Sequence, residues 1–208
     1  MFSKCEMCIV QHMSTKVASV PLLTGLTTGA ETPPAVEFSG NPACGLRLPS
    51  RVLTDGEPRP RCWFLGVHGG AGETSLAQLF AGVAAAGHHW PIDPQARSRV
   101  VLVARTNFAG MTATQAAMRD WSVNHRQHAA VLGLVLIADR PGGLPRQLLD
   151  LQHDLEGATP HLWRLPWVER WTLGEIPSPE NTPRKEVEVL RLGVTAALKA
   201  ARKEGQDG

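Results

Sequence analysis

Three closely spaced glycines, Gly69, Gly70 and Gly72, separate an apolar segment from a segment with helical spacing. A tight strand-to-helix turn of this kind directs backbone N–H groups and the positive end of a helix dipole toward one place, which suits an anion. In a phosphate-binding loop, a lysine normally precedes the Ser/Thr and reaches the β- and γ-phosphates. In this chain Glu73 occupies that position, ahead of Thr74. The loop therefore predicts an anion site whose charge is unfavourable for a triphosphate.

The segment HGGAGETSLA, from His68 to Ala77, resembles the deviant Walker A motif of ParA/MinD-type ATPases, Lys-Gly-Gly-x-Gly-Lys-Thr-Thr-Leu-Ala. The glycines, Thr74, Leu76 and Ala77 match, whereas His68 and Glu73 replace the two lysines. The loop is also similar to the HGGAGE-type loops of an actinobacterial family. The resemblance implies a P-loop NTPase-like fold, ATP or another nucleotide as ligand, and a link to plasmid partition or a conjugative element. It makes the following residues the candidate nucleotide or anion site: Gly69, Gly70, Ala71, Gly72, Glu73, Thr74 and Ser75.

A replacement for the missing positive charge must come from an arginine, because no lysine lies between residues 17 and 184. Arg105 and Arg140 each follow a predicted strand and are the candidates, with His68 as a further auxiliary residue. A unit charge at about 4 Å is worth about 4 kcal/mol at an effective dielectric near 20, so exchanging Lys for Glu removes an attraction of that order and adds a comparable repulsion. We therefore expect no catalytic residue and a non-catalytic or weakly nucleotide-binding interaction or regulatory module. The alternatives are a divergent ATPase that uses an arginine in place of the lysine, and a DNA-associated partition protein.

Asp139 is the candidate for the aspartate that steadies magnesium in ParA/MinD-type ATPases, because it follows the apolar run VLGLVLIA. It is equally explained as a turn residue ahead of Pro141. About a dozen residues separate the predicted first helix from the next strand, so we expect the switch segments and the Walker B strand to be missing. Glu73 also has a structural explanation, since an acid in the first helical turn is stabilising by about 0.3–1 kcal/mol.

Other residue patterns predict less specific chemistry. His68-Gly69-Gly70 is similar to the oxyanion loop of α/β-hydrolases, but the chain has no G-x-S-x-G elbow for the nucleophile. Cys5, Cys8 and His12 have half the spacing of a zinc site, and a loose N-terminal tail is the alternative. His88-His89 and the pair His125 and His128 are expected to be solvated. We expect no metal site.

Three tryptophans lie four residues apart, at positions 163, 167 and 171. We expect Trp163 in the core. Trp167 and Trp171 follow a predicted strand and Pro166, so they belong to the core, to a partner surface together with Arg170, or to the wall of a ligand crevice.

The composition indicates a globular protein, with 43% apolar residues and a formal net charge of +2. This charge, without a basic stripe carrying interleaved aromatics, does not indicate a nucleic-acid partner. No apolar run reaches the roughly 18 residues of a membrane span. We expect a cytoplasmic bacterial protein with a protein partner, and homo-oligomerisation is left open.

Strand-like and helix-like segments alternate, which predicts an α/β fold with a reduced parallel sheet of about four strands and flanking helices. We expect a flexible or disordered arm over 1–58, a P-loop-like α/β domain over 59–178, and a C-terminal helix and tail over 179–208. Thr182 is the expected N-cap of that last helix. The predicted strands are 62–67, 99–104, 131–138 and 161–165, and the predicted helices are 74–86, 111–121, 145–155 and 183–203.

Overall fold

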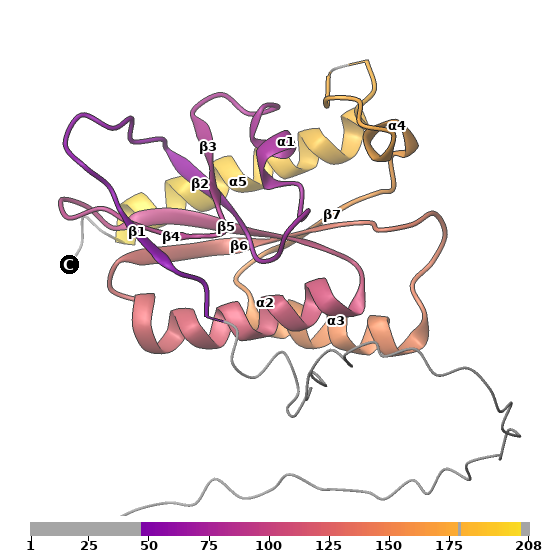
Figure 1. The fold of residues 1–208 in the computed structure, drawn as a ribbon, viewed down its shortest axis with the longest axis horizontal. Coiled ribbons are helices and arrows are strands. Elements are labelled where there is room, and N and C mark those ends of the chain that lie inside the picture. Colours follow the sequence, from indigo (N-terminus) through magenta and orange to yellow (C-terminus); the bar gives the residue numbers. More distant parts are fainter. Residues whose placement is uncertain (1–46, 179, 205–208) are drawn as a thin grey trace, which may run out of the picture. The chain divides into compact units, whose positions relative to one another are not determined.

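The computed structural model describes residues 47–178 and 180–204 (Figure 1). The expectations for residues 1–46, including the flexible arm and the Cys5, Cys8 and His12 group, lie outside the described residues.

The main sheet has five parallel strands in the order β3-β2-β5-β6-β7. Central strands read as continuous apolar runs because helices and loops cover both faces of the sheet. The predicted α/β class and parallel sheet are therefore confirmed, with five strands rather than about four. The strands are β2 (Cys62–Gly66), β3 (Val83–Gly87), β5 (Ser98–Arg105), β6 (Ala129–Ile137) and β7 (Leu162–Leu165).

Helices cover both faces of this sheet, with α2 and α3 on one side and α1 and α5 on the other (Figure 1). Alternate strand residues serve the two sides: Leu102 packs toward α2 and α3, and its neighbour Val101 packs toward α5. The α2 helix continues into a π-helical turn, η1, at Trp121–His125. The helices are α1 (Glu73–Ala77), α2 (Phe108–Asp120), α3 (Arg146–Ala158), α4 (Glu169–Thr172) and α5 (Arg184–Glu204).

The predicted helix over 74–86 is wrong beyond its first turns. The α1 helix ends at Ala77, and Gly82 adopts a left-handed φ of 75° just before β3 begins. Leu76 and Phe80 do have helical spacing, and alanine favours a helix. However, the segment VAAAG pairs with β2 instead. That pairing satisfies the backbone groups at the edge of the sheet, and it outweighs the local helix propensity.

Residues 47–58 are not irregular throughout, which corrects the expectation for this end of the described chain. Strand β1 (Ser50–Val52) pairs in parallel with β4 (Trp90–Ile92) in a separate two-stranded sheet. Leu48 and Leu53 on either side of β1 are buried with Trp90 in the core on the α2 side. The chain between β3 and β5 thus covers the sheet without a helix.

The C-terminal helix belongs to the same core as the sheet, so a boundary at residue 178 does not separate it. Leu190 and Val194 of α5 are buried in one cluster with Phe64 and Val101 of the strands. The expected cap at Thr182 is wrong, because the buried Thr182 hydroxyl has no hydrogen-bond partner among the described residues.

Trp163 packs against this core, as predicted, in a space that two glycines leave free. A Cβ atom added to Gly133 would lie 2.5 Å from the Trp163 ring, and one added to Gly193 would overlap the indole nitrogen.

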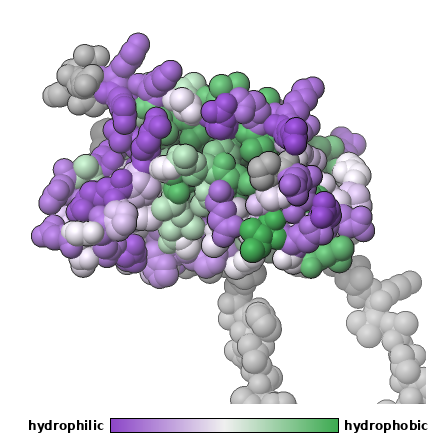
Figure 2. Space-filling view, turned by 90° about the horizontal axis from the view of Figure 1, so that it is seen from above, coloured by the Kyte–Doolittle hydropathy of each residue, from purple (hydrophilic) through white to green (hydrophobic). Residues whose placement is uncertain are grey.

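The surface over α1 and α5 has an apolar centre surrounded by hydrophilic residues (Figure 2), and Val189 and Leu192 of α5 are exposed. Among the described helices, none combines the length and apolar character needed to cross a bilayer.

Candidate anion-binding site

The order of the strands defines where a ligand site is expected. Taken in chain order, the strands of the main sheet lie second, first, third, fourth, fifth. Connections from β2 and from β5 therefore run in opposite directions, and doubly wound sheets bind ligands at such a switch point, outside the carboxyl ends of the strands. The glycine loop follows β2 and Arg105 ends β5. The topology thus brings these two sequence candidates together.

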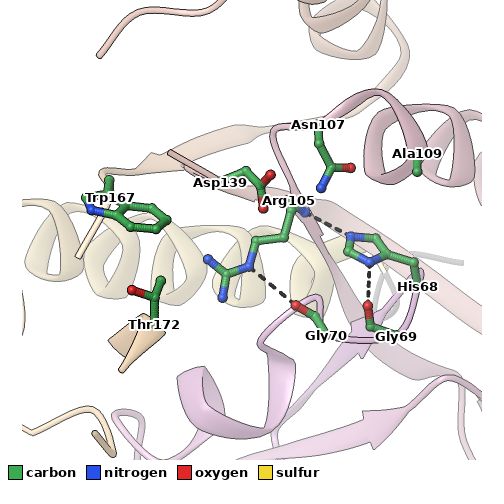
Figure 3. A pocket seen from close by; sticks show the side chains of 9 residues that line it. All are labelled: His68, Gly69, Gly70, Arg105, Asn107, Ala109, Asp139, Trp167 and Thr172. Atoms are coloured by element: carbon green, nitrogen blue, oxygen red, sulfur yellow. Dashed lines mark hydrogen bonds between the residues drawn. The ribbon is translucent and has the colours of Figure 1, made fainter. Parts of the chain in front are cut away.

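A pocket of about 540 Å³ opens at this edge (Figure 3). Its walls come from the segments that follow β2, β5, β6 and β7. It is lined by His68, Gly69, Gly70, Arg105, Asn107, Ala109, Asp139, Trp167 and Thr172.

The Arg105 side chain crosses this pocket and joins two loops. Its Nε donates to the carbonyl oxygen of Gly70 at 3.3 Å, and its Nη1 donates to the carbonyl oxygen of Ala138 at 3.3 Å. Burial lowers the pKa of Arg105, and the nearby Asp139 carboxylate raises it. Arginine stays protonated in proteins. A half-buried positive charge therefore lies over the glycine loop.

His68 fixes the loop to β5. The backbone N–H of Arg105 donates to Nε2 of His68 at 3.0 Å, so the ring proton must sit on Nδ1, which donates to the Gly69 carbonyl at 2.9 Å. The ring lies against Gly110, where a Cβ atom would be 2.9 Å from Nε2. His68 thus positions the loop and the Arg105 backbone relative to each other.

Glu73 does not line this pocket. The side chain is buried, with 6% of the residue exposed. It rests against β2, since a Cβ atom on Gly66 would be 2.5 Å from its Oε2. His88 donates from Nδ1 to the Gly66 carbonyl at 2.8 Å and places Nε2 at 3.9 Å from Glu73 Oε1. The carboxylate therefore faces the β2–β3 edge and a half-buried histidine, and it is not part of the pocket wall.

Some of the remaining loop candidates form the turn, and the others are exposed to solvent. Gly70 and Gly72 have φ of 75° and 97°, which favour glycine. Ala71 is buried, and its N–H donates to the His68 carbonyl at 3.2 Å. Thr74 and Ser75 are exposed. Residues 71–75 do not line the pocket, whereas residues 68–70 do.

The end of β6 contributes one carboxylate. Asp139 is exposed in the pocket wall, and its N–H donates to the Thr106 hydroxyl at 3.1 Å. Arg140 is exposed and does not line the pocket. Within the described ranges, no group of three or more His, Cys, Asp or Glu side chains could hold a metal ion. A single exposed carboxylate is a poor site for the magnesium ion that the resemblance to ParA/MinD-type ATPases implies.

Of the residues singled out after Pro166, Trp167 lines the pocket, whereas Arg170 and Trp171 do not. Trp167 lines the pocket, together with Thr172 (Figure 3). Arg170 instead forms an ion pair with Glu175 at 2.8 Å, and Trp171 donates from Nε1 to Asn181 at 3.2 Å. Arg170 and Trp171 therefore bind residues that follow α4 in the same chain, and these contacts stabilise the turn after α4.

Sequence reasoning missed three lining residues, Asn107, Ala109 and Thr172. Asn107 had a usable signal, because an asparagine ahead of a helical run is a typical N-cap and here follows a strand. Its Oδ1 accepts from the Gly110 N–H at 2.7 Å. Ala109 and Thr172 carry no chemical signal of their own.

Neither the curated proteins nor the solved structures contain a match to this chain. The model of a family of unknown function, DUF6668, matches residues 61–190. The match covers more than half of the chain and includes all strands of the main sheet, every residue that lines the pocket and the first part of α5. The chain therefore belongs to the family of unknown function DUF6668.

Proposed function

We propose that this chain is a P-loop-like regulatory module that binds a nucleotide, or another phosphate-bearing ligand, weakly and without hydrolysing it. The observation that carries the proposal is the position of Arg105, whose guanidinium lies over the glycine loop inside the pocket. The module would act through a protein partner in the cytoplasm.

Two features support phosphate binding. The loop motif lacks its lysine, and Arg105 at the end of the neighbouring strand supplies a positive charge in its place. A planar guanidinium suits phosphate oxygens. The Glu73 carboxylate faces His88 and the β2–β3 edge, so it does not oppose an anion at close range. Together they remove the main electrostatic objection that the loop sequence raises.

Two other features support weak binding without hydrolysis. Among the described residues that line the pocket, Arg105 is the permanent cation and Asp139 the carboxylate, so their formal charges cancel. The Arg105 guanidinium is also engaged by two backbone carbonyls. Phosphoryl transfer depends on charge neutralisation and on positioning of the phosphates, and one engaged arginine supplies little of either.

The test is a calorimetric titration of the purified chain with ATP, with and without magnesium, together with a phosphate-release assay. We expect an affinity weaker than about 100 μM, equivalent to about −5.5 kcal/mol, and no turnover above buffer. Arg105→Ala should abolish binding, because a charged hydrogen bond contributes about 1.5–3 kcal/mol. The exposed Arg140→Ala is the matched control and should bind as the parent does. Turnover that disappears in Thr74→Ala would refute the regulatory reading.

The second candidate is a divergent ATPase in which Arg105 replaces the lysine, and the same arginine favours it. It predicts saturation at micromolar ATP and turnover that is lost in Arg105→Ala but kept in Arg140→Ala. Binding without turnover separates the two candidates in favour of regulation.

The cellular setting rests on the resemblance to ParA/MinD-type proteins alone. We extend the proposal to plasmid partition or a conjugative element on that ground. A directly DNA-associated role is the third candidate, and salt-dependent retention of the chain on duplex DNA is the measurement that would favour it.

A further inference from the structure

A second pocket, of about 340 Å³, lies at the opposite edge of the sheet from the anion site. Its walls come from the segments that precede β5, β6 and β7, from the π-helical turn and from the last turns of α5. It is lined by Arg97, Trp121, Arg126, Ala130, Val131, Leu132, Pro160, His161, Ala197, Ala200 and Ala201.

The floor of this pocket is apolar and its rim is basic. Small side chains of α5 leave the depression open, and β6 supplies aliphatic residues beneath them. Arg97 and Arg126 are both exposed at the rim. None of the described residues that line it is acidic. An apolar centre surrounded by polar groups, with arginine among them, is the usual anatomy of a protein–protein contact.

The rim is partly preorganised. Arg97 donates from Nη2 to the Ala129 carbonyl at 3.3 Å, and Trp121 donates from Nε1 to the same oxygen at 2.8 Å. Two side chains, one from the segment before β5 and one from η1, therefore converge on the first residue of β6. A fixed arginine loses less side-chain entropy when it binds a carboxylate than a freely rotating one does.

The charge at this edge is not neutralised within the described part of the chain. Other arginines of the described residues form ion pairs within the chain, as Arg164 does with Glu156 and Arg191 does with Glu188. Neither Arg97 nor Arg126 pairs with a carboxylate of residues 47–178 or 180–204. The last turns of α5 add Lys199, Arg202 and Lys203, and the one acid among residues 189–204 is the terminal Glu204.

Part of this pattern has a purely structural explanation. Basic residues in the last turn of a helix are favoured by its dipole, which accounts for Arg202 and Lys203. Arg126 is the C-cap residue of η1, so the dipole of the continuous α2–η1 helix favours it as well. Arg97 precedes strand β5 and lies at no helix end, so that explanation does not reach it. The apolar floor also distinguishes the site from a surface for nucleic acid, whose phosphate backbone has no group to fill it.

We infer that this amino-terminal edge of the sheet docks an acidic segment of a protein partner, with carboxylates on Arg97 and Arg126 and one apolar side chain over the alanines of α5. The inference is independent of the nucleotide proposal, because the two pockets share no lining residue.

The test uses a fluorescein-labelled amphipathic peptide of about 12 residues, roughly three helical turns, with glutamates on one face and leucines on the other. Fluorescence anisotropy with the full chain should show saturable binding that weakens as salt is added, because exposed charges are screened. The double variant Arg97→Gln, Arg126→Gln should weaken binding about tenfold, equivalent to about 1.4 kcal/mol. The double variant Arg140→Gln, Arg146→Gln carries the same charge change at exposed positions outside the pocket, and it should bind within about twofold of the parent.

A second pair of variants probes the floor. Ala200→Glu places a carboxylate in the pocket and should weaken binding at least as much as the double arginine change, whereas the neutral Ala200→Gln should have a smaller effect. Position 200 is exposed on α5, and both replacements are good helix formers, so the fold should be kept.

Four results would each overturn the inference. They are absence of saturable peptide binding, equal binding of a peptide with serine in place of leucine, equal loss in the Arg140, Arg146 control, and duplex DNA bound with the same dependence on Arg97 and Arg126.

Discussion

Gly110, in the first turn of α2, is the residue that most directly tests the contact between the glycine loop and β5. A Cβ atom at this position would lie 2.5 Å from the Arg105 carbonyl oxygen and 2.9 Å from His68 Nε2. The first neighbour is backbone, so the strand end or the helix has to shift. Gly110→Ala should therefore disturb the anion site without adding or removing a charge.

The magnitude follows from two opposing effects. Overpacking of a filled position costs about 1–3 kcal/mol, and alanine in place of a helical glycine gains up to about 1 kcal/mol. We expect a net loss of about 1–2 kcal/mol, or roughly 2–8 °C in Tm for a chain of this size. Anion affinity should fall as well, because His68 and Arg105 move with the contact.

The matched control is Gly157→Ala in α3, because a Cβ atom there meets nothing within 4 Å. It should raise the free energy of unfolding by about 0.5–1 kcal/mol and leave anion affinity unchanged. Urea unfolding followed by circular dichroism measures both variants, and calorimetry measures their affinity. If Gly110→Ala proved as stable as Gly157→Ala, the packing of His68 and Arg105 around Gly110 would be wrong.

Four further predictions use other parts of the structure. Burial lowers the pKa of His125 from 6.5, and Asp120 opposes this effect. The unfolded chain therefore binds more protons than the folded chain, so the stability contributed by neutral His125 should be complete above about pH 6.5 and should fall below it. Urea unfolding at about pH 7.5 and 5.5 should show a smaller loss of stability in His125→Gln than in the parent. Burial raises the pKa of the Cys62 thiol to about 12, so mass spectrometry after iodoacetamide treatment should find Cys62 unmodified in the native chain and alkylated in urea. Glu73→Gln should change anion affinity less than about threefold in calorimetry, since its carboxylate faces His88; tightening by more than about tenfold would place that carboxylate in the pocket. Gly193→Ala should lower the free energy of unfolding by about 1–3 kcal/mol in urea, because the added methyl group meets Trp163.

The direction of the Glu73 side chain depends on contacts that the loop motif does not specify. The loop sequence identifies Glu73 as the residue in the lysine position, but its side-chain direction is set by the contact with Gly66 and His88. His88 comes from the turn after β3, a strand that the sequence pattern assigned to a helix. The contact that orients the Glu73 side chain therefore depends on a strand that the sequence pattern does not predict.

Several features follow from the sequence alone, because they depend on short-range patterns. Continuous apolar runs identify β2, β5, β6 and β7, and the glycines identify a tight turn before a helix. The position of Arg105 directly after an apolar strand was enough to propose it as the cation of the site, since all parallel strands end at the same edge.

Only the tertiary structure decided the rest. Whether VAAAG is helical or extended depends on pairing with β2, which lies some twenty residues earlier in the chain and whose other edge pairs with β5. The direction of the Glu73 carboxylate, the bridge of Arg105 between two carbonyls, and the basic pocket at the far edge all join segments that are distant in sequence. Local propensity differences of a few tenths of a kcal/mol per residue cannot determine such contacts, because strand pairing and burial contribute more.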